Sequence, residues 1–141
     1  MKLSEEEKTA IVLHRLQKAK DTLVEAKGTI ALGYWNTAAN RLYYACYYVA
    51  SALLMKHGYS AHTHAGIIGL LSLHFVSKGI ICKELGKFYS QLFELRQTGD
   101  YSDWMVMEEA DVQSFVEPAD KFIDALEKLI TESSPYVDHE V

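Results

Sequence analysis

The segment from Leu95 to Tyr101 holds the residues best suited to chemistry on a charged ligand. Arg96 stands near the end of a predicted helix with an apolar inner face, and Asp100 follows four residues later. An arginine and an aspartate at that spacing can clamp a helix end to the loop that follows it. The same guanidinium can also bind a phosphate through two parallel hydrogen bonds. The spacing leaves both interpretations open.

A second cation, Arg41, opens a tyrosine-rich segment and has two comparable interpretations. Its long side chain can extend along the apolar surface to water, or it can pair with Asp100. We therefore predict a ligand-binding cleft that collects these cations with nearby polar and aromatic residues. The predicted cleft residues are Arg41, Tyr44, His64, Arg96, Asp100 and Tyr101.

Three histidines, His57, His62 and His64, surround one short predicted loop and are the only group that resembles a metal site. Zinc requires three or four converging ligands, and no Asp or Glu lies between Glu25 and Glu84. Helical HExxH and paired CxxC spacings are absent from the sequence. We therefore predict neither a metal nor a cofactor, and we interpret His74, on an inward helical face, as a core residue.

The sequence also lacks the usual signs of nucleophilic catalysis. Cys46 and Cys82 lie in apolar runs, which predicts two buried, unreactive thiols in a reducing cytoplasm. No GxSxG elbow and no glycine-rich phosphate loop is present. Standard enzyme motifs are therefore missing from the chain.

The elements that must position these residues are predicted to be helices. Ser4 and Glu7 form a capping-box pattern, and an apolar stripe of period three to four then continues as far as Ile30. Gly33 is the predicted stop of this first helix. A second helix is predicted from residue 38 to about residue 56, with Asn36 or Thr37 as its cap and a glycine just past its end.

The second predicted helix carries no charge for fourteen residues after Arg41. A helix that is apolar on all sides must be surrounded by other helices or by another subunit, and a small domain rarely covers every face by itself. We therefore predict a homodimer whose interface includes Tyr43, Tyr47 and Tyr48.

The remaining chain predicts two or three more helices. Residues 65–78 form a third helix with Thr63 as its cap, and residues 82–98 form a fourth that ends at Gly99. A last helical region reaches about Ile130, with Pro118 expected to kink or split it. The fold class is therefore all-α, an antiparallel up-and-down bundle of four or five helices. Residues 1–130 form one domain, followed by a frayed tail of residues 131–141.

Composition limits the function classes. The 141 residues are 49% hydrophobic and 23% charged, which fits one globular domain and excludes global disorder. No apolar run reaches the ~20 residues of a membrane span, and we expect a cytoplasmic protein without a membrane association. Residues 1–99 hold twelve Lys and Arg against seven Asp and Glu, whereas residues 100–141 hold two against twelve. This acidic C-terminal third argues against binding to long duplexes.

The sequence resembles the HEPN domain family (higher eukaryotes and prokaryotes nucleotide-binding). The resemblance begins with the run from Gly33 to Tyr48, GYWNTAANRLYYACYY, and continues through Ala52-Leu53-Leu54, Gly58, Thr63-His64-Ala65-Gly66, Leu95-Arg96 and Gly99-Asp100-Tyr101. It covers roughly residues 8–130. Each piece is weak alone, but the set is specific.

The resemblance implies a helical bundle that is usually dimeric and often paired, in prokaryotes, with a minimal nucleotidyltransferase in toxin–antitoxin or defence modules. Many members are metal-independent endoribonucleases with an arginine followed, four to six residues later, by a histidine. Arg96 matches that arginine, but the histidine positions hold Tyr101, Ser102 and Asp103. His64 can substitute only if the fold brings it across.

Metal-free RNA cleavage needs an acid and a base that titrate near neutral pH, and histidine meets that need without assistance. Without the motif histidine, we favour a non-enzymatic HEPN-type dimer that binds a nucleotide, RNA or a minimal nucleotidyltransferase. The alternative is a divergent metal-independent endoribonuclease that uses Arg96 with His64 or Tyr101.

Overall fold

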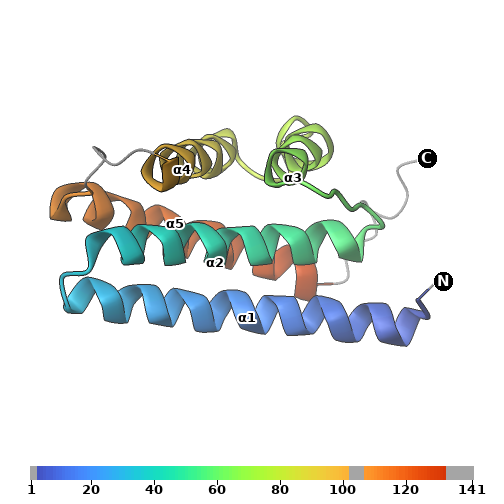
Figure 1. Ribbon diagram of the computed structural model, residues 1–141. Coiled ribbons are helices and arrows are strands. Elements are labelled where there is room, and N and C mark those ends of the chain that lie inside the picture. The colour runs from blue at the N-terminus through green and yellow to red at the C-terminus, as the bar shows by residue number, and fades with distance from the viewer. Residues whose placement is uncertain (1–2, 102–106, 133–141) are drawn as a thin grey trace.

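The computed structural model describes residues 3–101 and 107–132, with the backbone alone for 98–101. Every regular element in these ranges is helical, which confirms the all-α prediction. Three long helices lie lengthwise, and α3 and α4 cross above them, seen nearly end-on (Figure 1). The elements in chain order are α1 (Glu5–Ala31), α2 (Trp35–Lys56), α3 (His64–Leu71), the short π-helix η1 (Ser72–Val76), α4 (Lys83–Tyr101) and α5 (Glu109–Thr131).

Local signals set several of the helix ends. The Ser4 hydroxyl accepts a hydrogen bond from the Glu7 amide at 3.1 Å, and the Glu7 carboxylate accepts one from the Ser4 amide at 2.8 Å. Gly33 and Gly58 follow α1 and α2 with φ angles of 80° and 85°, a left-handed conformation that glycine adopts without steric cost. The predicted cap at Ser4 and the predicted stop at Gly33 are confirmed.

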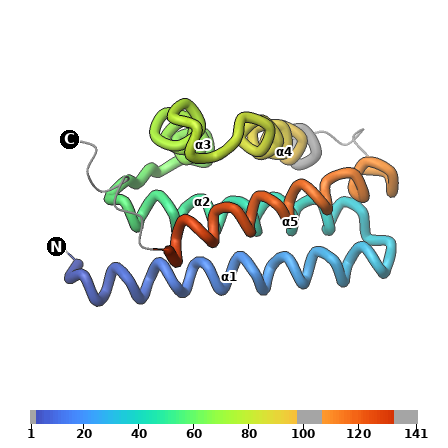
Figure 2. The backbone as a smooth tube through the Cα atoms, turned by 180° about the vertical axis from the view of Figure 1, so that it is seen from behind, coloured from blue at the N-terminus to red at the C-terminus, as the bar shows by residue number. Residues whose placement is uncertain are grey.

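Four elements differ in detail from the prediction, and one of them is the predicted helix of residues 65–78, which is divided into α3 and the π-helix η1. Helix α2 begins at Trp35 because the Asn36 side chain does not cap it but accepts a hydrogen bond from the Met107 amide at 2.9 Å. Helix α4 continues through Gly99 to Tyr101, since a glycine weakens a helix by only ~1 kcal/mol. Helix α5 is not split at Pro118 but runs through it as one element, and its path curves toward its N-terminal end (Figure 2).

Helix α2 is the centre of the core, since it packs against both α1 and α5, and α3 and α4 lie above it (Figures 1 and 2). Half of its side chains are buried, including Leu42, Val49 and Leu53. Cys46 is fully buried, and burial raises the pKa of its thiol, so this sulfur is unreactive as predicted. Cys82 is exposed. The prediction of two buried thiols was wrong for Cys82 because it precedes α4 on the surface.

The end of α5 is fastened by a lysine from α2. The ammonium of Lys56 donates to the carbonyl oxygens of Leu129 at 3.2 Å, Ile130 at 2.5 Å and Glu132 at 3.2 Å. The last carbonyls of a helix have no partner within the helix and carry partial negative charge. Lys56 therefore satisfies and neutralises this helix end.

We expect Lys56→Met to lower the free energy of unfolding by about 1–3 kcal/mol, because the α5 carbonyls lose a charged donor. Urea denaturation followed by circular dichroism measures the change. The matched control is Lys128→Met, an exposed lysine in the last turn of α5, for which we expect a change within about 0.5 kcal/mol. Equal effects of the two substitutions would contradict the role given to Lys56.

Candidate functional site

Three half-buried tyrosines form a stripe along the outer face of α2. Tyr44, Tyr47 and Tyr48 follow the three- and four-residue spacing of one helix face. The centroid of the Tyr44 ring lies 6.0 Å from that of each of the other two, and Tyr47 and Tyr48 are 5.7 Å apart. We refer to these three residues as the tyrosine stripe, which is partly open to solvent.

Tyr43 differs from the tyrosine stripe because it points inward. Its exposed fraction is 0%, and its ring packs against Tyr89 and Phe93 of α4. The prediction that Tyr43 lies in a dimer interface was therefore wrong, since the protomer itself covers this side chain. One helix position separates it from Tyr44, and the resulting rotation of ~100° decides which ring is covered. Tyr47 and Tyr48 keep surface that a second copy could contact.

His64, the first residue of α3, lies directly on this aromatic cluster. Its imidazole stacks on the Tyr47 ring with centroids 4.4 Å apart and planes 12° apart. Its Nδ1 atom is hydrogen-bonded to the Tyr43 hydroxyl. The Thr63 cap, whose hydroxyl accepts from the Gly66 amide at 2.9 Å, fixes the turn that delivers His64 to this place.

Arg96 reaches the same tyrosines from α4. Its Nη2 donates to the Tyr44 hydroxyl at 2.9 Å, and its guanidinium lies 5.5 Å and 5.3 Å from the ring centroids of Tyr43 and Tyr44. Both distances fall within the cation–π range. Two adjacent tyrosines of α2 therefore position Arg96 and His64, which are far apart in the sequence.

Burial sets the protonation states in this cluster. Burial raises the pKa of the Tyr43 hydroxyl, so it is protonated at neutral pH and we assign it as the donor to Nδ1 of His64. Partial burial, followed by the positive charge of Arg96, lowers the pKa of His64. A neutral imidazole that accepts at Nδ1 carries its proton on Nε2. His64 is therefore a neutral hydrogen-bond donor at pH 7.

We expect the His64 environment to make the protein less stable in mild acid. Because the folded-state pKa is lowered, the unfolded chain binds the proton first as pH falls below about 6.5, and the free energy of unfolding decreases. The groups that face His64 are Arg96, the Tyr43 hydroxyl and the rings of Tyr44 and Tyr47. Urea unfolding at pH 7.5 and pH 5.5 should show a smaller acid-induced loss for His64→Gln than for the native protein. The same loss in both proteins would refute this.

The other predicted cleft residues divide into two groups. Arg41 lies 5.4 Å from the Tyr44 ring centroid, but its Nη1 is 3.7 Å from the Glu25 carboxylate, so its charge is already compensated. The side chains of Asp100 and Tyr101 lie outside the described residues. The structure thus brings four of the six predicted residues together: Arg41, Tyr44, His64 and Arg96.

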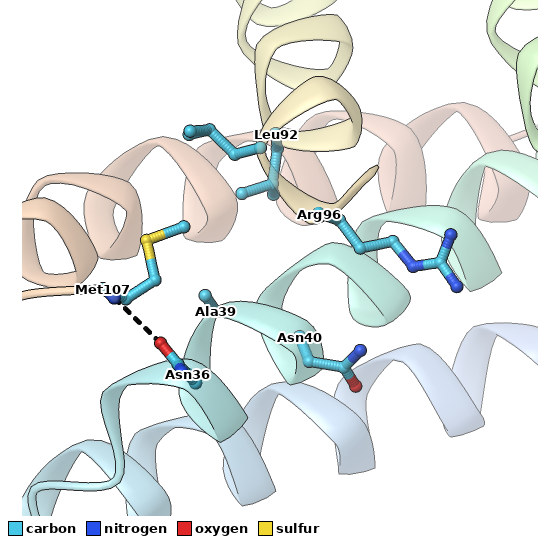
Figure 3. A pocket seen from close by; sticks show the side chains of 7 residues that line it. Asn36, Ala39, Asn40, Leu92, Arg96 and Met107 are labelled. Atoms are coloured by element: carbon cyan, nitrogen blue, oxygen red, sulfur yellow. Dashed lines mark hydrogen bonds between the residues drawn. The ribbon is translucent and has the colours of Figure 1, made fainter. Parts of the chain in front are cut away.

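A small cavity lies beside Arg96, between the start of α2 and α4 (Figure 3). It has a volume of about 60 Å³, and Asn36, Leu92 and Met107 contribute to its lining. The Arg96 guanidinium extends away from Met107, toward the side where the Asn40 amide lies (Figure 3). The cavity has room for only a few water molecules.

Two cations on α1 contribute to this face and were not predicted as site residues. The Lys18 ammonium lies 4.7 Å from the Tyr48 ring centroid, and the Arg15 guanidinium donates to the Ser51 hydroxyl at 2.9 Å. The helical period places both residues beside the buried stripe of α1, where charged side chains ordinarily face water. The spacing of Arg15 and Lys18 by about one turn puts them on one face of α1. The sequence does not show that this face lies against the tyrosine stripe, because that depends on how α1 packs on α2.

Within the described ranges, no three His, Cys, Asp or Glu side chains gather as metal ligands. His74, predicted to be a core residue, is half-buried and stacks on the Tyr59 ring with centroids 4.0 Å apart. Residues 3–101 and 107–132 contain no helix with the length and hydropathy of a membrane span. The open, cationic and aromatic face of α2 is therefore the strongest candidate site in the described part of the chain.

Comparison with known proteins identifies the family. The HEPN domain model matches residues 12–129, nearly the whole helical unit. The chain belongs to the HEPN domain family. This HEPN protein is 40% identical over 124 residues to a UPF0332 protein of Thermotoga maritima, covering 88% of this chain and 94% of that one.

Two further relatives extend the comparison. A Methanocaldococcus jannaschii protein that carries the name "putative toxin" is 30% identical over 117 residues, covering 83% of this HEPN protein and 87% of its own length. The crystal structure of TT1696 from Thermus thermophilus superposes with a TM-score of 0.71 at 18% identity, covering 84% of this chain and 97% of that chain. The second likeness shows that the fold is shared.

Proposed function

We propose that this HEPN protein is a homodimeric, non-enzymatic module that binds single-stranded RNA or a nucleotide through Arg96 and the tyrosine stripe. The observation that carries the proposal is the guanidinium of Arg96, held by the Tyr44 hydroxyl at 2.9 Å at the edge of an open aromatic face. Phosphates bind arginine, and bases stack on tyrosine rings, so the two chemistries needed for a nucleotide meet here.

The partner that fits this proposal is a minimal nucleotidyltransferase in a toxin–antitoxin module. The support is family membership together with a relative named as a toxin. An adjacent open reading frame with a Gly-Ser and Asp-x-Asp pattern would be the partner to co-express. We expect it to co-purify with the HEPN protein, and separate elution of the two proteins would count against the pairing.

Binding is tested with a fluorescein-labelled decamer of oligouridylate, measured by fluorescence anisotropy, and with uridine monophosphate, measured by calorimetry. We expect saturable binding of the decamer that weakens with salt, because phosphate contacts release counterions. No binding of either probe would overturn the proposal. Light scattering should give twice the protomer mass of 16.0 kDa. A stable monomer would contradict the dimeric state in this proposal.

A divergent metal-independent endoribonuclease is the second candidate, and the shared contacts of His64 and Arg96 with Tyr43 and Tyr44 favour it. In such a reaction the 2′-hydroxyl gives its proton to a base, here water, and attacks phosphorus, while the departing 5′-oxygen takes a proton from an acid. A neutral imidazole is too weak an acid for this, so His64 would donate from its protonated form, while Arg96 stabilises the charged phosphorane. The side chain of Tyr101, the other residue proposed to act with Arg96, lies outside the described part of the structure.

Incubating the purified protein with the decamer in the presence of a chelator separates the two candidates. An intact decamer that remains bound supports the binding module. Cleavage that disappears in both Arg96→Ala and His64→Ala would instead establish the ribonuclease. Cleavage that survives both substitutions would point to a contaminating nuclease, which a mock purification identifies.

A further inference from the structure

A pocket adjoins the tyrosine stripe at Tyr47 and extends beyond the residues used in the function proposed above. Its volume is about 190 Å³, and its polar lining residues are Arg15, Tyr47, Ser51, Tyr59 and Ser60. One guanidinium and four hydroxyl-bearing side chains are all capable of donating hydrogen bonds, and no carboxylate lines the pocket. This donor set suits an anion.

The charge of Arg15 is uncompensated in the described part of the chain. Its Nη1 donates to the neutral hydroxyl of Ser51 at 2.9 Å, and no carboxylate of the described residues forms an ion pair with it. Lys20 and Lys27 on the same helix each contact a carboxylate of α5 at 2.9 Å. Arg15 therefore differs from these lysines in having its positive charge available for a ligand.

The position of this pocket relative to Arg96 follows from α2. Ser51 lies seven residues after Tyr44, which is two helical turns on the same face and about 10.5 Å along the axis. Tyr44 contacts Arg96 at one end, and Ser51 contacts Arg15 at the other. The rings of Tyr47 and Tyr48 lie between them. This separation equals roughly three stacked nucleotides at ~3.4 Å each.

We propose that Arg15 and Ser51 form a second phosphate subsite, so that the ligand is a single-stranded oligonucleotide that spans the tyrosine stripe and contacts both arginines. Its bases stack along the tyrosine rings while the phosphates at either end meet Arg96 and Arg15. The inference rests on the function proposed above and makes it more specific, because a mononucleotide can occupy only one of the two subsites.

The test compares Arg15→Gln with the native protein on the oligouridylate decamer and on uridine monophosphate. We expect decamer affinity to fall about ten-fold, the loss typical of one charge-assisted contact, and the affinity for the mononucleotide to stay unchanged. The slope of log affinity against log salt should decrease by about 0.7, the value for one phosphate contact on a single strand. Ser51→Ala removes the hydrogen bond that holds the Arg15 guanidinium, and it should lower the affinity for the decamer two- to three-fold.

The matched control is Lys27→Gln, which removes one positive charge from α1 on the side that faces α5. An equal loss of decamer affinity in this control would overturn the subsite, because long-range charge would then explain the effect. Unchanged decamer binding in Arg15→Gln would also overturn the second subsite. If decamer binding then still required Arg96, the proposed function would stand without that subsite. If the native protein binds neither probe, the function and the subsite both fail.

Discussion

Replacing Arg96 by glutamine is expected to weaken binding of the oligouridylate decamer roughly hundred-fold, the largest functional effect of any substitution in the described site. Glutamine removes the positive charge and the two-pronged donor that a phosphate requires. It also removes a cation that lies 5.5 Å and 5.3 Å from two tyrosine rings. Fluorescence anisotropy at fixed low salt measures the loss, and circular dichroism confirms that the variant is folded.

Two further substitutions make this result specific. Arg96→Lys keeps the charge but lacks the planar fork, so we expect it to recover only part of the affinity. Arg41→Gln removes a cation already paired with Glu25 and should cost less than ten-fold. If Arg41→Gln and Arg96→Gln lowered the decamer affinity equally, the total positive charge of this face would explain binding. The specific role assigned to Arg96 would then be wrong.

Replacing Phe122 by alanine is expected to lower the free energy of unfolding by about 3–5 kcal/mol. Phe122 lies on α5 with an exposed fraction of 0%, and its ring centroid is 5.1 Å from that of Tyr89 on α4. The substitution leaves a cavity where α5 meets the helix that carries Arg96. Because a small domain is stable by only ~5–15 kcal/mol, this loss is a large share of the total. Urea denaturation measures it.

Leu73→Ala provides the control, since Leu73 on η1 is 61% exposed. We expect its effect on the free energy of unfolding to stay within about 0.5 kcal/mol. A small loss for Phe122→Ala, similar to that of Leu73→Ala, would show that α5 does not close the core. The position of α4, and with it the position of Arg96, would then need another explanation.

The sequence by itself determined which segments are helical and where several of them begin or end. The capping box at Ser4, the cap at Thr63 and the glycines at 33 and 58 are local signals, because each depends on a hydrogen bond or a φ angle within a few residues. The sequence also indicated Arg96 as the cation best suited to bind a charged ligand. The family resemblance is confirmed by the match over residues 12–129.

The tertiary structure alone decided which side chains share the site. Tyr43 and Tyr44 are both apolar-face tyrosines by sequence, but α4 covers the first and leaves the second half open. Asn36 was predicted to cap α2 because of its residue type and position. Its side chain instead accepts a hydrogen bond from the amide of Met107, which lies 71 residues away. Arg15, which was not predicted, joins the candidate site only because α1 packs beside α2, and the predicted His64 reaches Tyr43 and Tyr47 only because α3 packs there. Helical periodicity specifies faces, whereas the contacts between faces are long-range and depend on how the helices cross.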